Sequence, residues 1–148
     1  MATNAASETI LALDVGERRI GVARAFLGAP FPGPLTTLDN PDTFLSDIQA
    51  LCASEGAAAL VLGLPRNLSG QETTQTKWVQ EFGKRLESLL SIPVYWNDEA
   101  VTSIAAEAEL RRRGKPYAKG DIDALAAVYI LEDFIENNKH KHPELMHG

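Results

Sequence analysis

Residues Thr9 to Gly16, which read Thr-Ile-Leu-Ala-Leu-Asp-Val-Gly, decide the fold of this chain. The apolar residues run without a polar break into Asp14, and such a run is typical of a strand that is covered on both faces and lies centrally in a sheet. An aspartate at the end of that strand is costly to desolvate unless a cation, a hydrogen-bond donor or water meets it. Taken alone, an Asp-x-Gly motif more often caps a turn. The role of Asp14 therefore depends on the rest of the chain.

The residues that follow predict a hairpin. A glycine-containing turn over residues 16–19 separates the first strand from a second strand pattern over Ile20–Ala25, which indicates an antiparallel pair. Three prolines and two glycines then predict a loop from Gly28 to Pro34, ahead of a short third strand over Leu35–Leu38.

Helices and strands alternate over the rest of the chain. Asn40 followed by Pro41 is typical of a helix start, and apolar residues recur at helical spacings of three and four. The elements expected first are a helix to about Ser54, a strand over Ala58–Leu62, a polar loop over Gly63–Gly70 and a helix over Thr73–Leu90. The elements expected next are a strand over Ile92–Trp96 ending at Asn97-Asp98-Glu99, a helix over Ser103–Arg113, a basic loop over Gly114–Gly120, and a helix capped by Asp121 and running to about Asn137.

This order predicts an α/β fold with a mixed sheet, in which antiparallel hairpin strands are followed by parallel strands and helices cover both faces. We expect one domain over residues 9–137, a disordered leader over residues 1–8 and a disordered tail over residues 138–148. In open sheets of this kind ligands bind at the carboxyl ends of strands. Acidic residues at strand ends are therefore the first candidates for a site.

The composition is that of an acidic globular protein, with 148 residues, 45% hydrophobic content and a net charge of −6. This balance argues against general electrostatic capture of nucleic acid, although local basic patches can still bind it. The single cysteine, Cys52, permits no internal disulfide and fits a reducing compartment, and we expect it to fill space in the core. We expect no secretory signal, because the first residues have no basic start and no long apolar core, and no apolar run approaches the ~20 residues of a membrane span. We therefore expect a cytoplasmic protein without a membrane partner.

Three acidic residues stand where an apolar element ends or begins. Asp14 closes the first strand, Glu99 closes the last, and Asp123 falls in the expected first turn of the final helix. The residues three, four and seven positions after Asp123 are apolar, which places this carboxylate on the core-facing stripe of the helix. A carboxylate in a first turn also gains from the helix dipole, but Asp121 already serves that purpose. A second carboxylate on a packed face needs another partner.

Carboxylates gathered at one end of a sheet make an oxygen-only site for a hard divalent cation, so Mg²⁺ or Mn²⁺ is the expected cofactor. The sequence offers no cluster of cysteines and histidines for zinc. Two such ions about 4 Å apart activate water and stabilise the leaving oxygen in a phosphodiester displacement. Asp14, Glu99 and Asp123 are therefore the candidate metal-binding residues.

Four blocks of residues stand in a specific order and spacing. They are Asp14-Val15-Gly16 with Arg19-Ile20-Gly21-Val22-Ala23, then Val61 to Gly70, then Asp98-Glu99 with Thr102, and finally Lys119-Gly120 through Asp123 to Ala126-Ala127 and Ile130-Leu131. Together they resemble the YqgF/RuvX family of RNase H-like nucleases over about residues 9 to 136. Four blocks in register are specific, where any one alone would be weak.

The resemblance implies an RNase H-like fold in which Asp14, Glu99 and Asp123 are metal-binding catalytic carboxylates. The family has been assigned two roles, which are resolution of Holliday junctions and nuclease processing of the precursor of small-subunit ribosomal RNA. Residues that match the second and third blocks would lie beside the site and contact nucleic acid: Pro65, Asn67, Gly70 and Thr102.

This chain departs from the family pattern at two positions. The family commonly has arginine directly after the Asp-Glu pair, where this chain has Ala100, and aspartate before the second loop glycine, where this chain has Ser69. Loss of that arginine removes a phosphate contact or a partner for a carboxylate. The change bears on substrate handling rather than on metal binding.

Basic residues flank the elements that end near the carboxylates. Arg18 and Arg19 follow the first strand, and a cluster that includes Arg113 and Lys119 precedes the final helix. Cations at a helix C-terminus are favourable without any ligand, so a solvated face is the alternative for the cluster. A polyanionic substrate nevertheless requires such residues around an acidic metal centre, and all four are candidate nucleic-acid contacts. Tyr117 in the same cluster is able to stack on a base, although an exposed loop tyrosine needs no such role.

We expect a metal-dependent nuclease that hydrolyses phosphodiester bonds in structured nucleic acid, with the 5′ end of pre-16S ribosomal RNA as its substrate in ribosome biogenesis. One alternative is resolution of a Holliday junction, which requires two sites related by a two-fold axis and hence a homodimer. Another is a non-catalytic nucleic-acid-binding module for ribosome assembly, to which the Ala100 departure gives some weight. ATP-binding enzymes of the sugar-kinase and actin type also begin with a strand and Asp-x-Gly, but they need two such domains.

Overall fold

A five-stranded mixed sheet organises the part of the chain that the computed structural model describes, which is residues 9–65, 71–99 and 102–138. The strands are β2 (Thr9–Val15), β3 (Ile20–Phe26), β4 (Ala29–Leu38), β5 (Ala57–Pro65) and β6 (Val94–Glu99). The helices are the 3₁₀-helix η1 (Pro41–Thr43), α1 (Phe44–Ser54), α2 (Thr74–Leu89), α3 (Thr102–Arg113) and α4 (Lys119–Asn138).

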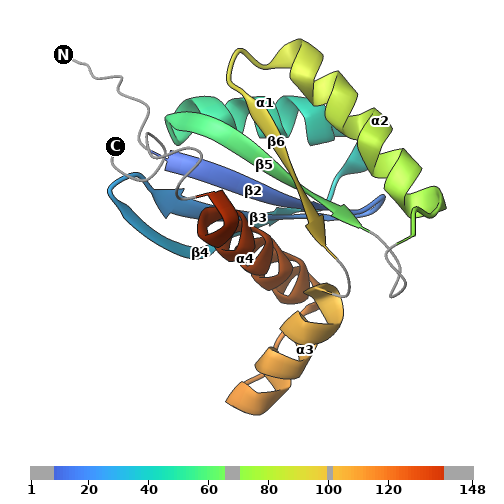
Figure 1. The fold of residues 1–148 in the computed structure, drawn as a ribbon. Helices are drawn as coiled ribbons and strands as arrows, with labels where there is room; N and C mark the ends of the chain where they lie inside the picture. Colours follow the sequence, from blue (N-terminus) through green and yellow to red (C-terminus); the bar gives the residue numbers. More distant parts are fainter. Residues whose placement is uncertain (1–8, 66–70, 100–101, 139–148) are drawn as a thin grey trace.

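The strand order is β4-β3-β2-β5-β6, so β2, the strand that ends near Asp14, lies at the centre of the sheet (Figure 1). β2 pairs antiparallel with β3 and parallel with β5, while β3 pairs antiparallel with β4 and β5 parallel with β6. The predicted α/β fold with an antiparallel hairpin followed by parallel strands is confirmed. Because β2, β5 and β6 run in the same direction, their carboxyl ends meet at one edge of the sheet.

Alternating side chains of the central strand β2 pack into two separate cores. Leu11, Leu13 and Val15 pack with residues of α1 and α2, whereas Ile10 and Ala12 pack with residues of α3 and α4. Figure 1 shows α4 across one face of the sheet, with α1 and α2 on the other. Since successive residues of a strand alternate between faces, Asp14 belongs to the face that α4 covers.

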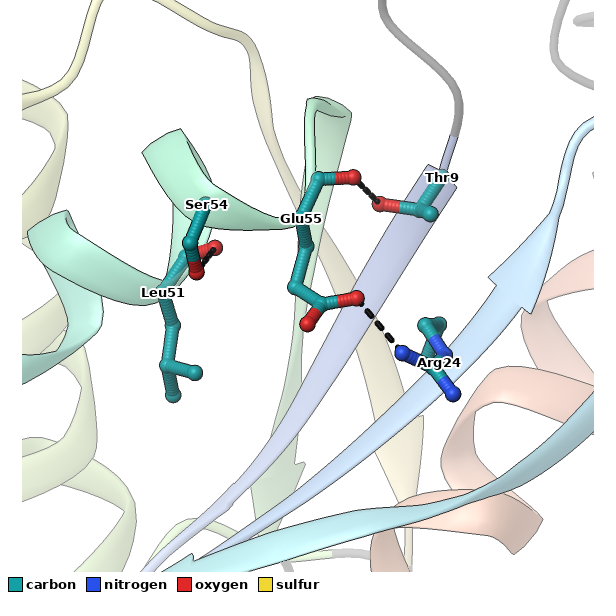
Figure 2. A network of polar contacts seen from close by, with 5 residues as sticks. All are labelled: Thr9, Arg24, Leu51, Ser54 and Glu55. Carbon is teal, nitrogen blue, oxygen red and sulfur yellow. Dashed lines mark hydrogen bonds and ion pairs between the residues drawn. The ribbon is translucent and has the colours of Figure 1, made fainter.

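Glu55 follows α1 directly and anchors, through hydrogen bonds, the end of the sheet that is far from Asp14. Its backbone oxygen accepts a hydrogen bond from the Thr9 hydroxyl at 3.0 Å, and its Oε1 accepts one from Nη1 of Arg24 at 2.7 Å (Figure 2). Gly56 follows with φ +61°, in the left-handed region that favours glycine. The start of β2 and the far half of β3 are thus fixed to the end of α1.

The prediction of a loop from Gly28 to Pro34 is wrong, because β4 begins at Ala29 and pairs with β3 along its length. The register shifts twice along this pair, between Val22 and Ala23 and between Arg24 and Phe26. Proline cannot donate to a ladder and is therefore confined to sheet edges. β4 is an edge strand, so it tolerates the prolines that indicated a loop.

Two further boundaries differ from the predictions. β5 continues to Pro65, so the expected polar loop over 63–70 starts later; residues 66–70 lie outside the described part. α4 begins at Lys119, which moves Asp123 from the first turn to the second. Asp121 lies within the first turn of α4 and does not precede the helix. From there its Oδ2 accepts a hydrogen bond from the Ala118 amide, which precedes the helix, at 2.9 Å.

The expected role of Cys52 as core filler is confirmed, because its side chain is buried with Phe44 and Ile48 beneath the sheet. The predicted leader over 1–8 and residues 139–148 of the predicted tail lie outside the described residues, and Asn138 closes α4. Within the described ranges, no helix combines the length and the apolar character that crossing a bilayer requires.

Candidate functional site

Asp14 lies one residue before the end of β2, partly buried beneath α4. Burial raises the pKa of its carboxyl from 3.8 to about 7, and the negative charge of Asp123 adds to that rise. A carboxylate that is poorly solvated and close to a like charge is a costly arrangement. Its presence at a strand end indicates a site that a cation or a proton completes.

Gly21 brings Asp123 to Asp14. Gly21 is the strand partner of Asp14 in the β2–β3 pair. A Cβ atom at position 21 would lie 1.9 Å from the backbone oxygen of Asp123 and 2.1 Å from its carbonyl carbon. The backbone of α4 therefore rests directly on β3 at this point, which requires a residue without a side chain. The close approach places Asp123 beside the end of the central strand.

Arg19 holds the Asp123 carboxylate. Its Nε donates to Oδ2 of Asp123 at 2.5 Å, with the two side chains 36% and 17% exposed. The interaction joins the turn between β2 and β3 to a helix 104 positions further along the chain. This contact uses Nε, which carries one of the five N–H donors of the guanidinium.

The carboxyl ends of β5 and β6 reach the same edge as Asp14. Glu99 is the last residue of β6 and pairs with Pro65, the last residue of β5. The structure describes the backbone position of Glu99 but not its side chain, so its role as a third ligand stays a prediction. Among the side chains that the structure describes, no group of three or more acidic, cysteine or histidine residues forms a metal cluster. The described site consists of the Asp14–Asp123 pair with Arg19.

Sequence reasoning missed a polar link that anchors β6 to α4. The buried Asn97 donates through Nδ2 to Oδ2 of Asp133 at 2.9 Å. Asn97 pairs with Gly63, and a Cβ at Gly63 would lie 2.4 Å from Cδ1 of Ile130. The sequence did offer a signal for this link. Asn97 is a polar residue two positions before Glu99, and alternation along a strand places the two on the same face. The link fixes the end of β6 against the helix that carries Asp123.

The predicted nucleic-acid contacts are spread around this edge. Arg18 is exposed beside Arg19 in the turn after β2. Pro65 ends β5, where its oxygen accepts a hydrogen bond from the Thr76 hydroxyl at 2.5 Å. Lys119 is exposed at the start of α4, and Arg113 is exposed in the last turn of α3, where it pairs with Glu109 at 3.2 Å. Thr102 begins α3, and Asn67, Gly70 and the departures at Ser69 and Ala100 lie outside the described residues, as does the Thr102 side chain.

One protein family matches the chain over nearly all of its described residues. Residues 8–137 match the family model described as "RuvX: Holliday junction resolvase". The chain belongs to the RuvX family. The resemblance read from the four sequence blocks is therefore confirmed, and the match covers every residue of the described site.

Relatives in the RuvX family align with almost the whole chain. A Chloroflexus aurantiacus protein described as "Putative pre-16S rRNA nuclease" is 42% identical, with 95% of this chain and 97% of the relative aligned. A Thiobacillus denitrificans protein with the same description is 39% identical, with 86% of this chain and 91% of the relative aligned. By homology this member of the RuvX family is a nuclease.

Solved structures show the same fold at low sequence identity. Thermus thermophilus RuvC in complex with a Holliday junction substrate superimposes with a TM-score of 0.52 at 15% identity, covering 87% of this chain and 95% of that chain. The free RuvC of the same organism gives a TM-score of 0.53 at 13% identity. This likeness confirms the predicted RNase H-like fold.

Proposed function

We propose that this RuvX-family protein is a divalent-metal-dependent nuclease of the cytoplasm that processes the 5′ end of pre-16S ribosomal RNA. The observation that carries the proposal is the Asp14–Asp123 pair at the carboxyl edge of the sheet, where Gly21 allows the close approach and Arg19 bonds Asp123. The descriptions of the Chloroflexus and Thiobacillus relatives support the choice of substrate.

The donor set fits Mg²⁺ or Mn²⁺. Both side chains supply oxygen only, and Mg²⁺ is commonly held by one or two carboxylates while it keeps several waters. The raised pKa of Asp14, which burial causes first and the Asp123 charge second, supports a site that a cation completes. Asp14 and Asp123 would hold the metal, with Glu99 as the predicted third ligand.

A bound divalent cation would activate a water nucleophile and stabilise the leaving oxygen of a phosphodiester. Asp14 and Asp123 would bind it and orient it, while the ion pair to Arg19 fixes the position of the Asp123 carboxylate. The guanidinium donors that Arg19 does not use on Asp123 are suited to a phosphate oxygen of the scissile strand.

A cleavage assay tests the proposal directly. The chain is incubated with an RNA that carries the 5′ leader of pre-16S RNA and with the mature 5′ end as the matched control substrate, in Mg²⁺, in Mn²⁺ and in EDTA. We expect cleavage of the leader RNA in either metal, none in EDTA, and none of the mature end. Binding of the leader RNA without turnover in either metal would instead identify a non-catalytic module.

The family description favours one second candidate, resolution of a four-way DNA junction. A junction resolvase cuts two strands related by a two-fold axis, so it needs a homodimer with two sites. Turnover of a four-way junction in preference to the leader RNA, together with a dimer in solution, would establish this function in place of RNA processing.

Arg19→Gln is expected to lower the cleavage rate by about tenfold or more, because a hydrogen bond to a charged group is worth roughly 1.5–3 kcal/mol and 1.36 kcal/mol is tenfold in rate. The partly exposed ion pair contributes little to folding, so the free energy of unfolding should fall by less than about 1 kcal/mol. Steady-state cleavage and urea denaturation measure the two effects.

Arg24→Gln is the matched control, since the Arg24–Glu55 pair has similar exposure, 33% and 20%, but lies at the far end of the sheet (Figure 2). Both variants should lose similar stability, and only Arg19→Gln should lose activity. An equal loss of activity in Arg24→Gln would mean that Arg19 acts through general stability.

A further inference from the structure

A cavity of about 290 Å³ lies between α3, α4 and the edge strand β4, outside the carboxylate site. Its apolar lining includes Leu110 of α3 and Leu125 of α4, both less than a tenth exposed. Pro34 of β4 and Pro116 of the loop between the helices also line it. The cavity is therefore an apolar recess that opens to solvent.

Tyr117 presents its ring to this cavity in a fixed orientation. The hydroxyl donates to Oε2 of Glu107 at 3.0 Å. The same hydroxyl lies beside Arg111, and this contact, followed by the Glu107 charge, raises the pKa of Arg111. With its polar end held from α3, the ring both packs against the core and lines the cavity. A tyrosine fixed in this way is a preformed stacking platform.

The rim of the cavity is positively charged in a protein that is acidic overall. Residues 107–121 carry five cations, which are Arg111, Arg112, Arg113, Lys115 and Lys119, against the carboxylates of Glu107, Glu109 and Asp121. Arg113 and Lys115 line the cavity directly, as does Asp121, whose Oδ2 is bonded to the Ala118 amide. Two cations against one carboxylate leave an excess of one positive charge on the lining itself, which suits an anionic ligand.

The cavity is close to Asp123 but on another flank of the same helix. Asp121 and Leu125 line it, and each is two residues from Asp123, which is about 200° around an α-helix. Because a helix with its side chains is about 10 Å across, the cavity and the carboxylate pair are separated by roughly that distance. A single strand that passes the carboxylates is able to reach the cavity a short way along.

We propose that this cavity binds one unpaired nucleotide of the RNA substrate, with the base stacked on Tyr117 and a phosphate on Arg113 and Lys115. This inference rests on the proposed function. Bases of a duplex are stacked and paired, so only a splayed-out base is free to enter such a recess, and single-stranded positions are where proteins read RNA. The arms of a four-way junction offer no such base. The cavity thus selects substrates with an unpaired segment beside the cleaved bond.

The test measures binding in EDTA, where cleavage does not interfere, using a short fluorescent single-stranded RNA and the same RNA paired with its complement. Tyr117→Leu should weaken single-strand binding about 5- to 150-fold, the range for losing one base stack, and change duplex binding less than about twofold. Tyr117→Phe keeps the ring and should stay within about threefold of the unmodified protein.

A second variant keeps the test independent of packing at Tyr117. Lys115→Gln, an exposed change, should reduce the slope of log affinity against log salt by about 0.7 for single-stranded RNA. Lys77→Gln, exposed on α2 across the sheet, is the matched control and should leave the slope unchanged. Equal slopes for the two variants would overturn the phosphate assignment.

Two outcomes separate the cavity from the nuclease. If the leader RNA is cleaved but Tyr117→Leu binds single strands as the unmodified protein does, or loses duplex binding equally, the nucleotide site is refuted and the nuclease stands. If Tyr117→Leu loses single-strand binding selectively while no RNA is cleaved in either metal, the nucleotide site stands and the proposed catalysis is refuted.

Discussion

Replacing Asp14 with asparagine is expected to abolish cleavage while making the metal-free protein more stable. An amide is a poor ligand for a hard divalent cation, and even loss of a residue that only orients a metal ligand costs up to ~100-fold. Asp14→Asn should therefore lose more than about 100-fold in the cleavage rate. Neither Mg²⁺ nor Mn²⁺ should restore it.

The gain in stability follows from the pKa of Asp14, which is about 7 in the folded chain against 3.8 ordinarily. The folded state holds this proton more tightly than the unfolded state does. Unfolding therefore becomes easier as the pH rises from about 4 to 7, and the full penalty is present above pH 7. Since each unit of pKa corresponds to about 1.4 kcal/mol, the penalty amounts to a few kcal/mol at pH 8.

Thermal denaturation in EDTA at pH 8 and at pH 5 measures this effect. The unmodified protein should gain stability as the pH falls through 7, and Asp14→Asn should show a flatter profile and a Tm several degrees higher at pH 8. Asp39→Asn, at an exposed aspartate after β4, is the control for removing one negative charge and should follow the unmodified protein. Robust metal-dependent cleavage by Asp14→Asn would refute the site.

Gly21→Ala is expected to destabilise the fold by about 3 kcal/mol or more. This is at or above the upper end of the free-energy cost of overpacking a core. The added Cβ would meet the backbone oxygen and carbon of Asp123 at 1.9 and 2.1 Å, and backbone atoms of a packed helix cannot rotate away. The same displacement would move Asp123 from Asp14. Cleavage should therefore be lost even at temperatures where Gly21→Ala remains folded.

Gly33→Ala is the matched control, because a Cβ at this position of β4 meets no atom within 4 Å. Urea denaturation and the cleavage assay should leave Gly33→Ala close to the unmodified protein. A Gly21→Ala variant with unchanged stability would mean that α4 does not rest on β3 as the structure shows.

The mixed sheet, with an antiparallel hairpin followed by parallel strands, and the meeting of Asp14 with Asp123 were both predictable, since each depends on a strong local pattern. The apolar run into Asp14 required a central strand, and the parallel units after the hairpin required its end to lie at the ligand-binding edge. The apolar residues after Asp123 placed that carboxylate on the packed face of its helix. Hydrophobic periodicity carries information of this kind because it follows directly from burial.

Features set by tertiary context were not predictable. Prolines in β4 indicate a loop unless the strand is known to lie at an edge, and that position depends on the whole sheet. The Arg19–Asp123 pair joins residues 104 positions apart, and no local pattern specifies such a partner. The recess around Tyr117 likewise exists only once α3, α4 and β4 have packed together.

The dependence of the site on α4 also sets a time order during synthesis. β2, which carries Asp14, is made first, and its partner Asp123 arrives only with the last helix of the described chain. A nascent chain that has emerged through β6 holds one carboxylate of the pair and lacks the other. The protein therefore leaves the peptide exit tunnel with its carboxylate pair unassembled, and the proposed nuclease site does not form until α4 has docked.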